Sequence, residues 1–193
     1  MGAEGKTSWR VFCAIELPED LKRRAGEHAA RLREAHPGVR ASWERPEKLH
    51  VTLKFLGEIE RLRVEALSEA AAAAVEGFAP FPLGVCGAGS FPPRGLPRVL
   101  WLGVEDESGA LARLHRRLED ECHARGFPRE QRAFSPHLTI ARLRSPDSAR
   151  PLAEAHCRTG FGPHTLTVSE LTIVRSELGP GGSRYTVIST HSF

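Results

Sequence analysis

Short runs of apolar residues, several of them alternating with polar residues, recur along the chain and predict β-strands. Successive side chains of a strand point to opposite faces of a sheet, so this alternation gives each strand a buried face and an exposed face. The predicted strands span residues 10–17, 39–43, 49–56, 81–91, 98–104, 137–143, 165–176 and 183–188. We expect Gly57 to end the third strand, and Gly179-Pro180-Gly181-Gly182 to form the turn between the last two.

Segments with helical spacing and helix-favouring composition separate these strands. The predicted helices span residues 19–35, 61–76, 108–125 and about 145–157. Pro18 is suited to the first turn of the first helix, and Ser108 is suited to cap the third. We expect the fourth helix to begin within Ser145-Pro146-Asp147.

This succession of strands and single helices predicts an α+β fold. The helices are too frequent for an all-β protein, and hairpin-length connections argue against a doubly wound parallel sheet. We expect two similar half-domains, or lobes, each an antiparallel sheet backed by helices, around a central cleft. A chain of 193 residues suits one such bilobal domain, which we assign to residues 9–193. Residues 1–8 are expected to form a flexible polar tail.

The composition is ordinary for a soluble globular protein, with 40% hydrophobic and 26% charged residues. A net charge of +3 is too small for a protein that coats duplex DNA, but it allows a locally positive cleft for a phosphate. The four cysteines lack the paired spacing of metal ligands, and no signal peptide or long apolar run is visible. We therefore expect a cytoplasmic monomer with reduced thiols and no membrane partner.

Two tetrads share the pattern His-apolar-Thr-apolar: His50-Val51-Thr52-Leu53 and His137-Leu138-Thr139-Ile140. Each lies in a predicted strand, so its His and Thr point to one face and its apolar pair to the other. A single copy would carry little weight, because a histidine on a strand is commonly structural. Two copies, separated by nearly half the chain, indicate that each lobe presents a His and a Thr to the shared cleft. Two imidazoles facing one substrate can act as general acid and general base near neutral pH.

Four segments together resemble the 2H phosphoesterase superfamily: RVFCAIELP at 10–18, LHVTLKFLG at 49–57, PRVLWLGVE at 97–105 and FSPHLTIAR at 134–142. Within that superfamily, the chain is most similar to the bacterial and archaeal RNA 2′,3′-cyclic phosphodiesterases, the 2′-5′ RNA ligase-like family. The resemblance extends from Arg10 to about Tyr185 and includes Leu171 and Ser176.

The resemblance implies hydrolysis of an RNA 2′,3′-cyclic phosphate to a 2′-phosphate, without a metal or another cofactor. It implies that His50 is the proton donor to the departing 3′ oxygen and that His137 is the proton acceptor that activates water. Thr52 and Thr139 would donate hydrogen bonds to the non-bridging phosphate oxygens. The partner would be an RNA or a nucleotide with a 2′,3′-cyclic phosphate end.

This scheme is chemically sound for an anionic cyclic phosphodiester. In-line attack on phosphorus needs a base on one side and an acid on the other, so groups from two opposing lobes suit it. Hydroxyl and cationic groups then stabilise the phosphoryl group as charge builds. The sequence has no Asp-rich cluster, Gly-rich phosphate loop or Cys-His ligand set that would provide another route.

Two further residues are assigned to substrate binding, both five positions after a tetrad histidine. The resemblance implies that Arg142 holds the phosphate or the base, although strict alternation places it on the face opposite His137. A strand bend or bulge would be needed to bring it into the cleft. Phe55 has the same odd offset from His50, and either packs in the core or stacks on a nucleobase. Lys54 is expected on the same face as His50.

The sequence leaves three alternative functions open. The chain could hydrolyse small cyclic nucleotides or ADP-ribose cyclic phosphate with the same chemistry. It could be a non-catalytic nucleotide- or RNA-binding module, but the presence of both His-Thr pairs argues against that interpretation. Ligation of 2′-5′ ends is the reverse reaction of the same site, and water favours hydrolysis.

Overall fold

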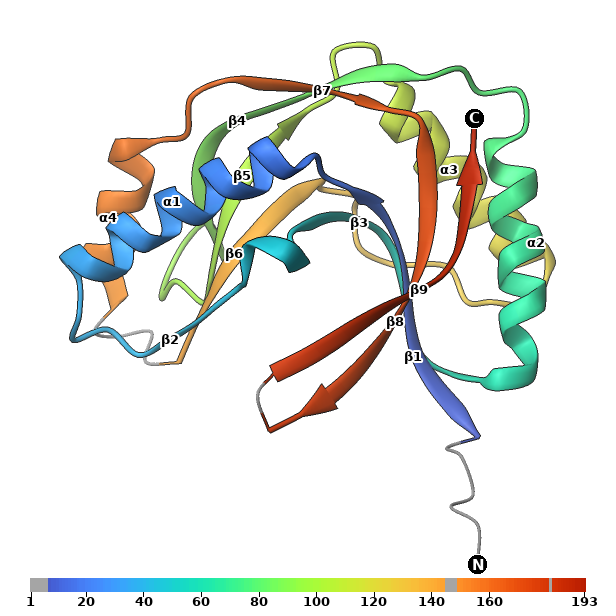
Figure 1. The fold of residues 1–193 in the computed structure, drawn as a ribbon, viewed down its shortest axis with the longest axis horizontal. Coiled ribbons are helices and arrows are strands. Elements are labelled where there is room, and N and C mark those ends of the chain that lie inside the picture. Colours follow the sequence, from blue (N-terminus) through green and yellow to red (C-terminus); the bar gives the residue numbers. More distant parts are fainter. Residues whose placement is uncertain (1–6, 145–148, 181) are drawn as a thin grey trace, which may run out of the picture.

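The computed structural model describes residues 7–144, 149–180 and 182–193 of the chain. In these ranges, nine strands form two antiparallel sheets with the orders β3-β1-β8-β9 and β2-β6-β5-β4-β7. The strands are β1 (Ser8–Glu16), β2 (Ala41–Trp43), β3 (His50–Glu60), β4 (Phe81–Phe91), β5 (Val99–Glu105), β6 (His137–Leu143), β7 (His164–Val168), β8 (Glu170–Gly179) and β9 (Gly182–Ser192). The α+β class and the pair of antiparallel sheets predicted from the sequence are confirmed (Figure 1).

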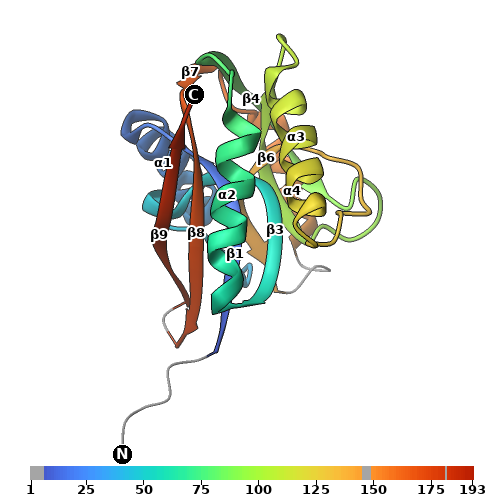
Figure 2. The same ribbon diagram turned by 90° about the vertical axis from the view of Figure 1, so that its right-hand side faces the viewer.

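Helices back both sheets, as Figures 1 and 2 show. Helices α1 (Glu19–Ala35) and α4 (Arg150–Thr159) contact each other, and they pack against β6 and β4 of the five-stranded sheet. Helices α2 (Val64–Val75) and α3 (Ala110–Ala124) also contact each other, and they pack against β8, β9 and β3 of the four-stranded sheet. Short 3₁₀ turns at Pro46–Lys48 and Arg61–Arg63 precede β3 and α2.

The two lobes are not the consecutive halves of the chain that the paired tetrads suggested. Strand β2 comes from the first half but pairs with β6, whereas β8 and β9 come from the second half but extend the sheet of β1 and β3. The two predicted lobes are therefore present, and each draws strands from both halves of the chain. Strands β3 and β6, which carry the two tetrads, belong to different sheets.

The predicted strand 165–176 is two strands in two sheets. Strand β7 pairs with β4 in the five-stranded sheet, and β8 pairs with β1 and β9 in the four-stranded sheet. The chain passes between the sheets at Ser169, whose carbonyl accepts a hydrogen bond from the Phe193 N–H over 3.0 Å. Apolar residues are buried on both sides of this crossing, so the local pattern alone does not reveal it.

Gly57 does not end its strand, contrary to our expectation. Strand β3 continues to Glu60 and pairs with β1 as far as Ser8. Gly57 adopts a φ of +69°, and the β1–β3 register shifts there by one residue. The glycine thus permits a bulge rather than a stop. Because Ser8 lies in β1, the end of the expected tail is ordered structure, and residues 1–6 lie outside the described residues.

Two helices begin later than predicted, and the first of these is α2, which begins at Val64 rather than at Arg61 because residues 61–63 form a 3₁₀ turn. Helix α3 begins at Ala110 rather than at Ser108, although the Ser108 hydroxyl accepts a hydrogen bond from the Ala110 N–H over 3.2 Å. The start predicted for the fourth helix, Ser145-Pro146-Asp147, lies outside the described residues. Helix α4 begins at Arg150, so these differences concern boundaries and not the existence of the helices.

A buried pair of histidines ties α1 and α4 to the five-stranded sheet. The His156 Nε2–H donates to the Trp101 carbonyl over 3.0 Å, so its Nδ1 accepts from the His28 Nε2–H, also over 3.0 Å. Burial is the main cause that lowers the pKa of His28, to about 4, and it also lowers the pKa of His156. Both rings are therefore neutral near pH 7, as this chain of hydrogen bonds requires.

Candidate active site

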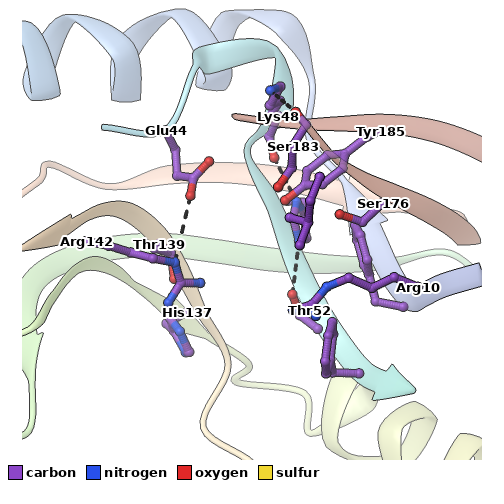
Figure 3. Close-up of a pocket in the computed structure, with 14 residues that line it drawn as sticks. Arg10, Glu44, Lys48, Thr52, His137, Thr139, Arg142, Ser176, Ser183 and Tyr185 are labelled. Atoms are coloured by element: carbon purple, nitrogen blue, oxygen red, sulfur yellow. Dashed lines mark hydrogen bonds and ion pairs between the residues drawn. The ribbon is translucent and has the colours of Figure 1, made fainter. Parts of the chain in front are cut away.

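A cleft of about 460 Å³ lies between the two sheets, and both tetrads line it. His50 and Thr52 reach it from β3, and His137 and Thr139 reach it from β6. Figure 3 shows the side chains as two groups that face each other, with Thr139 and His137 on one wall and Thr52 on the other. The structure thus brings together the four residues that the sequence marked as catalytic.

The two histidines are held in the same way, by a backbone carbonyl two residues before each of them. The Nδ1 of His50 lies 2.7 Å from the carbonyl oxygen of Lys48, and the Nδ1 of His137 lies 2.7 Å from that of Ser135. A carbonyl only accepts, so each Nδ1 carries its proton and each Nε2 is left for proton transfer. The Nε2 of His50 lies 3.0 Å from the Thr52 hydroxyl.

Aromatic side chains fix the orientation of both imidazoles. The His50 ring stacks on Phe12, with centroids 4.7 Å apart, and meets the edge of Tyr185 at 5.6 Å. The His137 ring meets Phe91 edge to face at 5.0 Å. These contacts restrict ring rotation, which pre-organises each Nε2 toward the cleft.

A β-bulge after each threonine brings the fifth residue after each histidine back into the cleft. In β3, Ala14 lies opposite Thr52 and Cys13 opposite Lys54, so Leu53 is an extra residue. In β6, Trp101 lies opposite Thr139 and Leu100 opposite Ala141, so Ile140 is an extra residue. Each bulge inverts the alternation that follows it.

Phe55 and Arg142 consequently line the cleft with the histidines. The bulge that Arg142 required is present in β6. Phe55 is 47% exposed, which excludes the alternative that it packs in the core.

The same inversion turns Lys54 away from His50. The Lys54 side chain is buried, and its Nζ lies 2.7 Å from a Glu119 oxygen. The expectation that Lys54 shares the face of His50 is wrong for this reason.

Most of the remaining lining residues were not singled out in the sequence as part of the site. They come from β1, the turn before β3, and the β8–β9 hairpin: Arg10, Phe12, Glu44, Lys48, Leu178 and Ser183, together with the two residues of the resemblance, Ser176 and Tyr185. No local pattern marks the first six, because their position in the cleft depends on which strands become neighbours. The cues in the sequence were two segments of the resemblance: residues 10–18, which contain Arg10 and Phe12, and the late segment with Ser176 and Tyr185.

The cleft holds cations on both walls and one carboxylate. Arg10 lies over the Phe55 ring, 4.6 Å from its centroid, and Lys48 donates to the Ser183 carbonyl. Arg142 lies 4.0 Å from the carboxylate of Glu44. Three cations against one carboxylate favour an anionic ligand, and the Arg10–Phe55 pair presents a flat surface on which a base can stack.

Burial lowers the pKa of His50 below its usual 6.5. The hydrogen bond to Lys48 and the carboxylates of Glu16 and Glu44 oppose this effect but do not cancel it. His50 therefore stays neutral down to a lower pH than an exposed histidine. A bound phosphate would favour its protonated form.

The described residues offer no group of three His, Cys, Asp or Glu side chains that could hold a metal ion. Each helix in the described ranges is too short or too polar to cross a lipid bilayer.

Comparison with known proteins shows the family of the chain. Residues 18–180 match the 2′-5′ RNA ligase superfamily. The chain is 36% identical to an RNA 2′,3′-cyclic phosphodiesterase of Thermotoga maritima, over 93% of this chain and 92% of that protein. It is 34% identical to the protein of the same name from Methanothermobacter thermautotrophicus, over 92% and 95% of the two chains.

Solved structures share the fold along nearly the whole chain. A protein of Thermus thermophilus superposes with a TM-score of 0.79 and 30% identity, covering 95% of this chain and 97% of that one. E. coli LigT complexed with 3′-AMP superposes with a TM-score of 0.76 and 28% identity, covering 96% and 98%. With a family match over most of its length and full-length relatives above 30% identity, the chain belongs to the 2′-5′ RNA ligase superfamily.

Proposed function

We propose that this protein hydrolyses 2′,3′-cyclic phosphate ends of RNA to 2′-phosphates, with His50 and His137 as an acid–base pair. The observation that carries the proposal is the placement of two imidazoles on opposing walls of one cleft, each with its Nδ1 hydrogen-bonded to a carbonyl. The names of the relatives from Thermotoga and Methanothermobacter support the substrate class. The complex of LigT with 3′-AMP supports a nucleotide ligand.

The reaction is an in-line displacement at phosphorus. The neutral Nε2 of His137 accepts a proton from water, whose oxygen forms a bond to phosphorus. The bond between phosphorus and the 3′ oxygen breaks, and the protonated Nε2 of His50 donates its proton to that oxygen. The product carries a 2′-phosphate and a 3′-hydroxyl, and proton transfer between the histidines through solvent restores the starting state.

The other cleft residues stabilise the phosphoryl group and hold the nucleoside. Thr52 and Thr139 donate hydrogen bonds to the non-bridging oxygens, and the Arg142 guanidinium offsets the charge that builds on them. The Thr52 hydroxyl lies 3.0 Å from the His50 Nε2, and the phosphate of a bound substrate replaces this contact. Phe55, exposed and flanked by Arg10, stacks on the terminal base.

A product assay in the presence of a chelator tests the reaction and its direction. We expect an oligoribonucleotide ending in a 2′,3′-cyclic phosphate to give a 2′-phosphate, identified by phosphorus NMR, at the same rate with and without EDTA. The reason is that the two imidazoles supply both proton transfers without a metal. A 3′-phosphate would reverse the assigned binding direction. Loss of turnover in EDTA that a divalent ion restores would contradict the acid–base mechanism.

The pH dependence tests the histidine pair. Turnover needs one imidazole protonated and one neutral, so log kcat/KM should be bell-shaped in pH. At low pH both rings are protonated and the base is lost. The acidic limb marks the loss of the first proton from the doubly protonated pair, and because burial lowers the pKa of His50, this loss should occur below pH 6.5. At high pH both rings are neutral and the acid is lost.

The limbs of this profile belong to the coupled pair and not to single residues. The profile of kcat should shift to higher pH than that of kcat/KM, because a bound phosphate favours the protonated imidazole. Circular dichroism across the same range provides the control for unfolding. A kcat/KM profile that is flat between about pH 5 and 8 would show that imidazoles do not carry the reaction.

A further inference from the structure

The cleft-facing side of β6 continues beyond Arg142 into an exposed row of arginines at the edge of the five-stranded sheet. In the pairing of β2 with β6, Ser42 lies opposite Arg142, and the Arg144 N–H donates to the Arg40 carbonyl over 2.8 Å. Residues opposite each other in an antiparallel pair, and alternate residues along a strand, share a face. Arg40 and Arg144 are therefore on the same face as Arg142, one step further from the histidines.

A contact within this row positions the Arg144 guanidinium over β2. The Arg144 Nε donates to the Ser42 hydroxyl over 2.9 Å, which holds the side chain across the sheet edge. Arg40 and Arg144 are both exposed. Among the residues that the structure describes, neither has a carboxylate within 4.0 Å, whereas Arg142 at the inner end of the row lies at that distance from Glu44.

The opposite wall and the inner end of the cleft offer less to a polyanion. On the opposite wall, Arg10 contacts Phe55 and Lys48 contacts Ser183, and the β8–β9 hairpin beyond them presents Leu178, which is 71% exposed. At the inner end, Glu16 lies opposite His50 in the β1–β3 register. The positively charged surface that leads away from the reacting phosphate thus follows β6 toward Arg40 and Arg144.

A cyclic phosphate lies at the 3′ end of an RNA, so the rest of the strand must leave the cleft with one phosphodiester per nucleotide. Alternate residues on a strand are about 6.7 Å apart. The spacing between Arg142 and Arg144 is therefore similar to the distance between successive phosphates of an RNA strand. Arginine binds phosphate oxygens through two parallel N–H donors. These features are typical of a protein surface that binds the phosphodiester backbone of a single-stranded nucleic acid.

We propose that Arg40 and Arg144 bind the phosphodiester groups on the 5′ side of the cyclic phosphate, so that the protein acts on oligoribonucleotide ends in preference to mononucleotides. This inference rests on the proposed function for its choice of substrate end. It adds a second set of contacts, outside the catalytic cleft, that binds the polymer and not the reacting group.

The test compares a mononucleotide with an oligonucleotide in the double variant R40Q/R144Q. Substrates are cytidine 2′,3′-cyclic phosphate and a hexaribonucleotide with the same 3′-terminal nucleotide. We expect kcat/KM for the hexamer to fall about 10-fold at 0.1 M salt, with that for cytidine 2′,3′-cyclic phosphate unchanged within twofold. The dependence of log kcat/KM for the hexamer on log salt should become shallower by about 0.7 for each phosphate that the variant no longer neutralises.

A matched control removes two arginines that do not line the cleft, in the variant R116Q/R158Q on α3 and α4. It should leave both substrates and the salt slope unchanged. Equal loss on both substrates in R40Q/R144Q, or a wild-type protein with no preference for the hexamer, would overturn the proposal. So would an equal effect of the control variant.

A binding measurement separates this inference from the proposed function. Fluorescence anisotropy follows a labelled hexaribonucleotide that ends in a 3′-phosphate and is not turned over. Binding to R40Q/R144Q that is weaker and less salt-dependent than binding to wild type supports the arginine row. This holds even if no cyclic phosphate is hydrolysed, and in that case only the proposed function fails. Identical binding to the two proteins refutes the row whatever the turnover.

Discussion

Replacing His50 or His137 by alanine is expected to lower kcat/KM on a cyclic-phosphate oligonucleotide about 10²–10⁴-fold, the range for general acid–base groups. Each wall of the cleft carries one tetrad histidine, and each change removes the Nε2 of that histidine. The loss should appear mainly in kcat, because proton transfer occurs in the transition state and not in binding. Thr52→Ala and Thr139→Ala should each cost less, since a hydroxyl contributes one hydrogen bond to the phosphoryl group.

Thermal unfolding distinguishes a catalytic loss from a folding defect, and H123A provides a matched control. His123 is an exposed histidine on α3 that does not line the cleft. Its replacement should leave kcat/KM unchanged. If H50A or H137A folds normally and keeps activity close to that of wild type, the two-imidazole mechanism is wrong.

Breaking the buried Lys54–Glu119 ion pair is expected to destabilise the fold by about 3–5 kcal/mol, because it leaves one charge unpaired in the interior. The exposed fractions of the two side chains are only 2% and 8%, and Nζ and Oε1 are 2.7 Å apart. Lys54 also donates to the Pro128 carbonyl over 2.9 Å, and Glu119 accepts from the Glu130 N–H over 3.2 Å. The pair therefore joins β3, α3 and the loop that leads to β6.

Urea denaturation of K54M and E119L measures this cost, and the double variant K54M/E119L is the control. Removing both charges should cost less than the sum of the single changes, because no unpaired charge remains. Single variants that are destabilised by less than about 1 kcal/mol would show that water or a neighbouring group solvates the remaining charge. Additive effects would show that the two side chains are not coupled.

Several features of this protein could be predicted from the sequence because they depend on neighbours along the chain. The first helix has the bounds predicted for it, residues 19–35, since Pro18 and the break at Pro37-Gly38 are local signals. The strands of both tetrads were predicted because alternation is a local pattern. Each His and Thr shares a face for the same reason, and both pairs reach the cleft.

The tertiary structure alone decided what depends on partner strands. Alternation does not encode register, so the bulges at Leu53 and Ile140 follow from the pairing of β3 with β1 and of β6 with β5. Those bulges bring Phe55 and Arg142 into the cleft and bury Lys54.

The crossing at Ser169 is also invisible in the pattern, because apolar residues face a core in both sheets. It places β8 beside β1 and β9 beside β8, and this arrangement supplies the cleft with Ser176 and Tyr185. The sequence thus determined the two His-Thr pairs, whose spacing lies within single strands. The surroundings of those pairs depend on contacts between segments far apart in the chain, where loop closure and sheet pairing, and not local preference, set the geometry.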